Sequence, residues 1–163
     1  MNIVFTECHY PIAKEINWDD VVEKISKEAA TTTILWDDFI LNPPLSKDTN
    51  KNLTIYTYNN PPTFLMKGDY YPGSIGEVFN HISTDSSVKK LHIYASLGKH
   101  SVTFNRHVDP VDVLLVQSKG TATYKCDDNT YTLNPGDSLL MPKGYYHEPV
   151  INESRITLSF SWE

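Results

Sequence analysis

Cysteine is scarce in this chain of 163 residues, and long apolar runs are missing. The two cysteines, Cys8 and Cys126, lie far apart and form no C-x-x-C pair, so neither a disulfide scaffold nor a cysteine-based zinc site is expected. No apolar run approaches the roughly 18 residues of a membrane-spanning helix, and no signal peptide is recognisable. We therefore expect a soluble, cytoplasmic protein with no membrane partner.

Positive charge is also in short supply. The chain has 14 Lys and Arg against 20 Asp and Glu, which gives a net charge of −6 with neutral histidines. A nucleic-acid partner would require a basic surface, so we expect none. Local cations are still sufficient to hold a small anionic ligand. No internal repeat or low-complexity tract is present, and the length predicts a single domain over residues 1–163.

The abundant residue types favour β structure. The chain contains ten Tyr, six Phe and three Trp, together with ten Pro. The first half also predicts two helices. Asn17 is a good N-cap for a helix over Trp18 to Ala30. Its expected apolar face is Val21, Val22, Ile25 and Ala29, and its expected solvated face is Glu23, Lys24, Lys27 and Glu28. Ser74, with Glu77 three residues later, is a candidate capping box for a second helix, whose expected apolar stripe is Ile75, Val78, Phe79 and Ile82. The polar, Pro-rich stretch 42–52 is expected to be a surface connection, and Trp36 a core residue.

Short apolar segments separated by turn residues follow from about residue 88. The strands predicted there are Leu91 to Leu97, Val102 to Asp109, Val111 to Gln117, Thr121 to Cys126, Thr130 to Leu133, Ser138 to Met141 and Ile156 to Trp162. Earlier in the chain, the predictions are an edge strand at Met1 to Thr6, strand and irregular chain over Thr32 to Leu41, and a strand from Leu53 to Tyr58. This spacing predicts a mainly β fold with a few N-terminal helices, built as an antiparallel double-sheet jelly roll. We expect residues 1–90 to be an N-terminal elaboration and residues 91–163 to form the barrel core.

Three side chains form a candidate metal site. On a strand, residues two apart face the same side, so His107 and Asp109 would both point into one cavity while Val108 points away. His147 follows 38 residues after Asp109, which leaves room for the chain to return on another strand. Two imidazoles and one carboxylate are the ligand set of non-haem Fe(II) oxygenases.

The His-x-Asp triplet alone is a weak motif, because an acidic residue two places after a histidine is common by chance. Of the six histidines, only His107 has such a partner. The alternative interpretation is a surface histidine beside a turn formed by Asp109 and Pro110.

Two longer segments add specificity. Residues 107–120 read HVDPVDVLLVQSKG and residues 133–147 read LNPGDSLLMPKGYYH. With residues 91–162 around them, they resemble a cupin, specifically the JmjC-type oxygenases and their ribosomal-oxygenase branch. In that branch an H-x-D motif runs into an apolar strand ending in Gln, and a P-G-D segment leads to P-x-G-x-x-H.

The resemblance implies an Fe(II)- and 2-oxoglutarate-dependent hydroxylase in which His107, Asp109 and His147 bind the iron. The residues expected to line the cosubstrate pocket are Tyr94, Tyr124, Arg155, Thr157 and Ser159. The family lysine that pairs with the far carboxylate of 2-oxoglutarate is replaced here by Ala122. Lys125 should face the opposite side of its strand, so Arg155 is the candidate replacement cation.

Two other classes of function fit the same residues: a metal-binding cupin whose chemistry does not use 2-oxoglutarate, and a non-catalytic cupin that binds a ligand or a partner protein.

Because extra segments of the ribosomal enzymes are not found in this sequence, the expected substrate is a small molecule or a short peptide. The sequence leaves the oligomeric state open, and a homodimer is one candidate because cupin sheets often dimerise. Four tyrosines are candidates to line the mouth of the barrel, where they would serve either substrate recognition or packing: Tyr70, Tyr71, Tyr145 and Tyr146.

Overall fold

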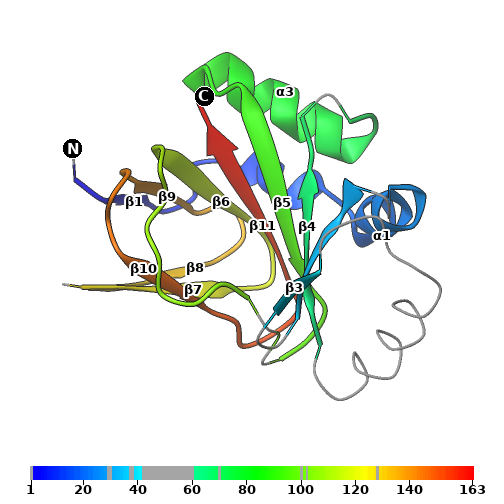
Figure 1. Ribbon diagram of the computed structural model, residues 1–163. Coiled ribbons are helices and arrows are strands. Elements are labelled where there is room, and N and C mark those ends of the chain that lie inside the picture. Colours follow the sequence, from blue (N-terminus) through cyan, green and yellow to red (C-terminus); the bar gives the residue numbers. More distant parts are fainter. Residues whose placement is uncertain are drawn as a thin grey trace.

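The computed structural model describes residues 2–28, 31–36, 39–41, 61–69, 71–99, 101, 103–127 and 129–163. Two antiparallel sheets lie over one another and helices cover the outer face of the larger one (Figure 1). The larger sheet contains, in spatial order, β1 (Val4–Thr6), β9 (Ser138–Met141), β6 (Val113–Lys119), β11 (Arg155–Ser161), β5 (Lys90–Ser96), β4 (Thr63–Lys67), β2 (Thr33–Trp36) and β3 (Phe39–Leu41). The smaller sheet contains β10 (His147–Val150), β7 (Ala122–Cys126) and β8 (Thr130–Leu133).

Three helical elements lie in the first half of the chain: the 3-10 helix η1 (Pro11–Glu15), α1 (Trp18–Lys27) and α3 (Ser74–Ser86). Asn17 caps α1 as predicted, since its side chain accepts a hydrogen bond from the Asp20 N–H at 2.7 Å. No helix in the described part of the chain combines the length and the apolarity needed to cross a membrane.

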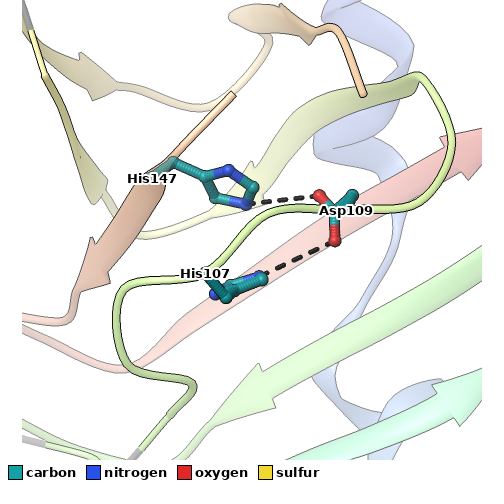
Figure 2. Close-up of side chains that lie close together, drawn as sticks. All are labelled: His107, Asp109 and His147. Carbon is teal, nitrogen blue, oxygen red and sulfur yellow. Dashed lines mark ion pairs between the residues drawn. The ribbon is translucent and has the colours of Figure 1, made fainter. Parts of the chain in front are cut away.

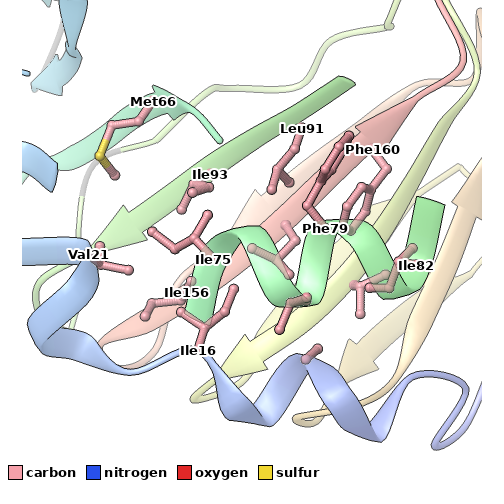
Figure 3. Close-up of a cluster of buried hydrophobic side chains, with 14 of the residues drawn as sticks. Ile16, Val21, Met66, Ile75, Phe79, Ile82, Leu91, Ile93, Ile156 and Phe160 are labelled. Atoms are coloured by element: carbon pink, nitrogen blue, oxygen red, sulfur yellow. The ribbon is translucent and has the colours of Figure 1, made fainter. Parts of the chain in front are cut away.

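The larger sheet buries one face beneath α3 (Figure 3). Along β5 and β11, alternate residues such as Leu91, Ile93 and Phe160 pack against the apolar stripe of α3, which includes Phe79 and Ile82. The stripe predicted for this helix is buried in full. The residues in between point to the other face, towards the smaller sheet, and it is this inner face that carries the polar side chains of the site.

The inner face has its own, smaller core where the two sheets meet. It comprises Val113, Leu115, Ala122, Tyr124, Leu133, Leu139, Met141 and Ile151. All of these lie near β6, β7, β8 and β9, so the smaller sheet covers only part of the larger one. The inner surfaces of β4 and β5 are left outside this apolar cluster.

Most of the predicted strands are confirmed. The strands Thr130–Leu133 and Ser138–Met141 have the predicted limits, and four others are shifted by one or two residues. The prediction of a strand from Val102 to Asp109 is wrong for the residues described there, because only His107 makes a β-bridge. Strands β4 and β10 were not predicted. The predicted strand Leu53 to Tyr58, the connection 42–52 and the Trp36 side chain lie outside the described residues.

Three smaller predictions about the helices are corrected by packing. Lys24, expected on a solvated face, is buried: it pairs with Glu28 and lies 4.1 Å from the centre of the Tyr71 ring. Val22, expected to face the core, is 51% exposed. The Ser74 hydroxyl does not cap α3, because it donates its hydrogen bond to Asp20 of α1 instead.

Strands from the first 90 residues take part in the larger sheet, since β1 pairs with β9, and β4 pairs with β5. The division into an elaboration and a barrel core stays a prediction. Both cysteines, Cys8 and Cys126, are free.

Candidate metal centre

The predicted triad comes together between the two sheets, at the edge of the smaller one (Figure 2). His147 is the first residue of β10, while His107 and Asp109 lie on the irregular segment before β6. His107 and His147 pair through two backbone hydrogen bonds of 3.0 and 2.9 Å. Asp109 is held by its carbonyl, which accepts a hydrogen bond from the Gly144 N–H at 3.1 Å.

The potential ligand atoms of these three side chains lie within 4.8 Å of one another. The carboxylate oxygens of Asp109 are 3.7 Å from Nε2 of His107 and 3.2 Å from Nε2 of His147, and each oxygen is joined to one ring by a dashed line in Figure 2. The ring centres of the two histidines are 4.4 Å apart. Val108 is exposed, as expected for a side chain that points away from the cavity.

Both imidazoles are oriented by the backbone. Nδ1 of His107 lies 2.6 Å from the Asn105 carbonyl oxygen, and Nδ1 of His147 lies 3.0 Å from that of Tyr145. A carbonyl can only accept, so each Nδ1 carries the proton and each neutral ring keeps a lone pair on Nε2. Metal-binding histidines are commonly fixed in this way by a partner on the second ring nitrogen. The donor set and its tautomers therefore fit a divalent transition metal.

Burial alone would lower the pKa of His147, which is almost completely buried. Hydrogen bonds to Asp109 and to the Tyr145 carbonyl, together with the negative charge of Asp109, outweigh burial and raise this pKa above its ordinary value. The same negative charge that attracts a proton to this position would attract a metal cation.

A cavity of about 370 Å³, part of it open to solvent, extends from the triad into the barrel. Its other lining residues are Tyr94, Thr103, Phe104, Leu115, Tyr124, Pro149, Arg155 and Ser159. Four of the five predicted cosubstrate residues thus line the same cavity as the triad. The fifth, Thr157, lies behind Arg155 and contacts it.

Of the described residues that line this cavity, Arg155 is the only lysine or arginine, and 1% of its surface is exposed. Its guanidinium donates to the hydroxyls of Ser96 and Thr157, both at 2.8 Å, and more weakly to that of Thr103 at 3.4 Å. Among the described residues, no carboxylate forms an ion pair with it. A buried charge that has only neutral partners is costly unless a ligand of opposite charge completes the site.

A hydrogen-bond chain fixes the direction of this guanidinium. The Gln117 amide nitrogen donates to the carbonyls of Lys119 and Gly120, so its oxygen is the atom that accepts from the Thr157 hydroxyl at 2.7 Å. Thr157 must then use a lone pair to accept from Arg155. Gln117 and Thr103 were not predicted to take part. The sequence signal for Gln117 is its place at the end of the resembling strand.

Two buried tyrosines flank the cation. Burial raises the pKa of Tyr94, and the charge of Asp109 raises it further. Burial also raises the pKa of Tyr124, which the positive charge of Arg155 partly opposes. Both phenols therefore stay neutral at pH 7, and their hydroxyls can serve as hydrogen-bond donors in the cavity.

The neighbouring positions agree with the sequence analysis in part. Ala122 is buried and shares the inner face of β7 with Tyr124, whereas Lys125 is exposed, as predicted. Tyr145 and Tyr146 are 41% and 46% exposed beside His147. Tyr71 does not line the mouth, because it packs against Lys24 at the helices, and Tyr70 lies outside the described residues.

Comparisons with known proteins agree with this architecture. Residues 92–153 match the model of the AraC-like ligand binding domain. No curated protein matches the chain. Among solved structures, the Escherichia coli ribosomal oxygenase YcfD is similar over 99% of this chain and 48% of its own, with 14% identity and a TM-score of 0.75. Its complex with cobalt and 2-oxoglutarate gives 15% identity and a TM-score of 0.76, with the same coverage.

The chain spans about half the length of these structures. At such identity the likeness shows the fold, which is a cupin jelly roll, as the sequence predicted. The likeness shows the fold alone, and membership of the ribosomal-oxygenase branch stays a prediction.

Proposed function

We propose that this chain is an Fe(II)- and 2-oxoglutarate-dependent oxygenase. The observation that carries the proposal is that one cavity combines a two-histidine, one-carboxylate triad with a buried arginine that has no anionic partner among the described residues. A dianion that chelates a metal at one end and carries a carboxylate at the other satisfies both features at once. The oxygenase with cobalt and 2-oxoglutarate that shares this fold supports the same assignment.

The metal would be held by Nε2 of His107, a carboxylate oxygen of Asp109 and Nε2 of His147. Three protein ligands leave coordination positions open, and a 2+ ion with one carboxylate keeps positive charge that favours an anionic chelator. When both are bound, Fe(II) and 2-oxoglutarate would supply C–H hydroxylation with O₂ as the oxidant: one oxygen atom enters the substrate, and the other enters succinate as 2-oxoglutarate loses CO₂. Cobalt in the similar structure is consistent with a divalent ion here.

Arg155 would bind the far carboxylate of the cosubstrate, with the hydroxyls of Tyr94, Tyr124 and Ser159 as further donors. The guanidinium has five N–H donors, and its three hydrogen bonds to hydroxyls leave donors for a ligand. Because Thr157 and Gln117 hold it in place, little ordering entropy is lost on binding. Arg155 thereby takes over the role of the family lysine whose position holds Ala122.

The apolar part of the lining would keep water away from the reacting centre. Leu115, Phe104 and Pro149 face the same cavity as the triad. The Phe104 ring centre lies 5.4 Å from that of His107 and 6.2 Å from that of Tyr94, so it bridges the metal ligand and the cosubstrate pocket. A dry site strengthens each polar interaction within it.

The test is anaerobic titration of 2-oxoglutarate into the Fe(II)-loaded protein. A metal-to-ligand charge-transfer band in the visible spectrum is expected, followed by succinate release once O₂ is admitted. Loss of both in His107→Ala is expected as well. An Fe(II) protein that gives neither band nor succinate would overturn the proposal.

The second candidate function is a non-catalytic, ligand-binding cupin, which the match to the AraC-like ligand binding domain favours. In that case the cavity would bind an organic anion at Arg155 without need for a metal. Binding of 2-oxoglutarate or succinate that is unchanged by removal of all metal would support this candidate against the first.

A further inference from the structure

A second, larger cavity adjoins the first beside Asp109. It measures about 950 Å³ with its open part, and it shares Tyr94, Asp109 and Ser159 with the inner cavity. It runs along the inner face of β4, β5 and β11, where the smaller sheet gives no cover. We call this cavity the trough. Along β11 the trough is lined by Ser159 and Ser161, whereas Arg155 is the first residue of that strand.

Basic residues form a row along the trough. His92 of β5 and Lys67 of β4 are directly paired across their strands, and Lys90 lies two residues from His92 on the same face. Neither lysine forms an ion pair with any residue in the described ranges. Like charges at such close positions repel one another, and an anion placed among them would relieve that repulsion.

The neighbouring lysines also affect the pKa of His92. Burial lowers its pKa, the charges of Lys67 and Lys90 lower it further, and Asp69 raises it. The neutral ring can then donate a hydrogen bond to an anion without adding a third positive charge.

The other groups of the trough limit the shape of a ligand. Pro110, Val111 and Val113 form an apolar wall that leads towards Asp109. Besides Asp109, the carboxylates of Asp69 and Glu163 line the trough. Asp69 accepts from the Leu91 N–H at 3.4 Å, and Glu163 follows Ser161, the partner of Lys90, at the end of β11. These acidic groups would disfavour a second negative charge on a ligand in the trough.

We propose that the trough binds the primary substrate and that this substrate is a small organic acid with one carboxylate and an aliphatic body. The carboxylate would lie among Lys67, Lys90 and His92, and the body along Val111 and Val113 towards the metal. The part played by this acid as a substrate rests on the oxygenase function proposed above. The binding site itself does not, and the two can be tested apart.

The test uses hexanoate and its neutral analogue hexanamide as probes, with the Zn(II)-loaded protein saturated with 2-oxoglutarate and binding measured by calorimetry. We expect hexanoate to bind about tenfold or more tightly than hexanamide. The double variant Lys67→Met with Lys90→Met should lose this preference. A charge-matched control, Lys89→Met with Lys125→Met, changes two exposed lysines outside the trough and should keep it. Equal loss in both double variants, or no preference in the unmodified protein, would overturn the proposal.

Arg155→Met separates the trough from the inner cavity. This variant should lose 2-oxoglutarate binding and keep hexanoate binding. Hexanoate binding that depends on Arg155 and not on the two lysines would place the acid in the inner cavity and refute the trough. Failure of 2-oxoglutarate to bind, with lysine-dependent hexanoate binding intact, would refute the oxygenase and leave the trough. A glutamate-containing hexapeptide that binds more tightly than hexanoate, again through the lysines, would contradict the small-molecule assignment.

Discussion

His107 and His147 exchange two backbone hydrogen bonds, with N–O distances of 3.0 and 2.9 Å, although 40 residues separate them in the sequence. The pair is an isolated antiparallel bridge at the edge of the smaller sheet. Each imidazole is then tied to a carbonyl two residues before it in the chain. The Nε2 positions are therefore set mainly by the backbone, which prepares the site for a ligand before any ligand binds.

Removal of one histidine ligand should abolish tight metal binding. His147→Ala is expected to weaken Co(II) binding by more than the roughly 10- to 100-fold that loss of an outer partner of a metal ligand costs. Isothermal titration calorimetry of the metal-free protein measures this affinity. His81→Ala, at an exposed position of α3, is the control and should bind as the unmodified protein does. If both variants bind equally well, the triad is not the metal site.

Arg155→Met should reduce 2-oxoglutarate affinity by about 30-fold or more, because truncation of one partner in a buried charge pair costs about 2–5 kcal/mol. Arg155→Lys should retain part of the affinity, since it keeps the charge without the planar fork. The charge-transfer band of the anaerobic Fe(II) protein reports the affinity of each variant. Unchanged affinity in Arg155→Met would show that the cosubstrate carboxylate binds elsewhere.

Arg155→Met is expected to weaken 2-oxoglutarate binding without destabilising the ligand-free protein. In the ligand-free protein, Arg155 is a buried cation with neutral partners only among the described residues, so Arg155→Met should leave the free energy of unfolding unchanged or raise it by about 1–4 kcal/mol. Urea unfolding without metal and 2-oxoglutarate measures this difference. Marked destabilisation would mean that the arginine serves the fold and not a ligand.

The alternation of side chains along short strand segments predicted many of the strands of this fold. Strands such as Ser138–Met141 are short, apolar and bounded by turn residues, so their sequence signal does not depend on distant contacts. The period of two also predicted that Arg155, Thr157 and Ser159 share one face of β11. The fold class follows from these elements and their order.

The remainder depends on contacts between distant segments. The segment that carries His107 and Asp109 was predicted as a strand, yet after the single bridge at His107 the chain turns away to start β6 at Val113. Lys24 is buried because Tyr71, 47 residues later, lies against it. Helical periodicity places charges on an outer face, but it cannot show which other element covers that face.

Two glycines near the site have left-handed backbones and should respond differently to alanine. Gly120 and Gly144 have φ angles of 62° and 80°. A Cβ at Gly144 meets nothing within 4 Å, so Gly144→Ala should cost only the backbone strain of about 1–2 kcal/mol. A Cβ at Gly120 would lie 2.1 Å from the Ser154 carbonyl oxygen, so Gly120→Ala should cost at least about 3 kcal/mol. Equal losses of unfolding free energy would contradict this close approach.

Asp20 connects α1 to the start of α3, because its carboxylate accepts hydrogen bonds from the hydroxyl and the N–H of Ser74. These bonds lower the pKa of Asp20, so its contribution to stability is complete above the ordinary value of about 3.9 and is lost as the pH falls through the lowered folded value. Asp20→Asn should cost about 0.5–1 kcal/mol at pH 7, and this difference from the unmodified protein should disappear in acid.

Asp19→Asn removes the same charge from the first turn of α1 without the contact to α3. Unfolding curves between pH 2.5 and 7, about the range over which an aspartate titrates, should separate the two variants. If Asp19→Asn shows an equal loss, the carboxylate acts through the α1 dipole and not through α3.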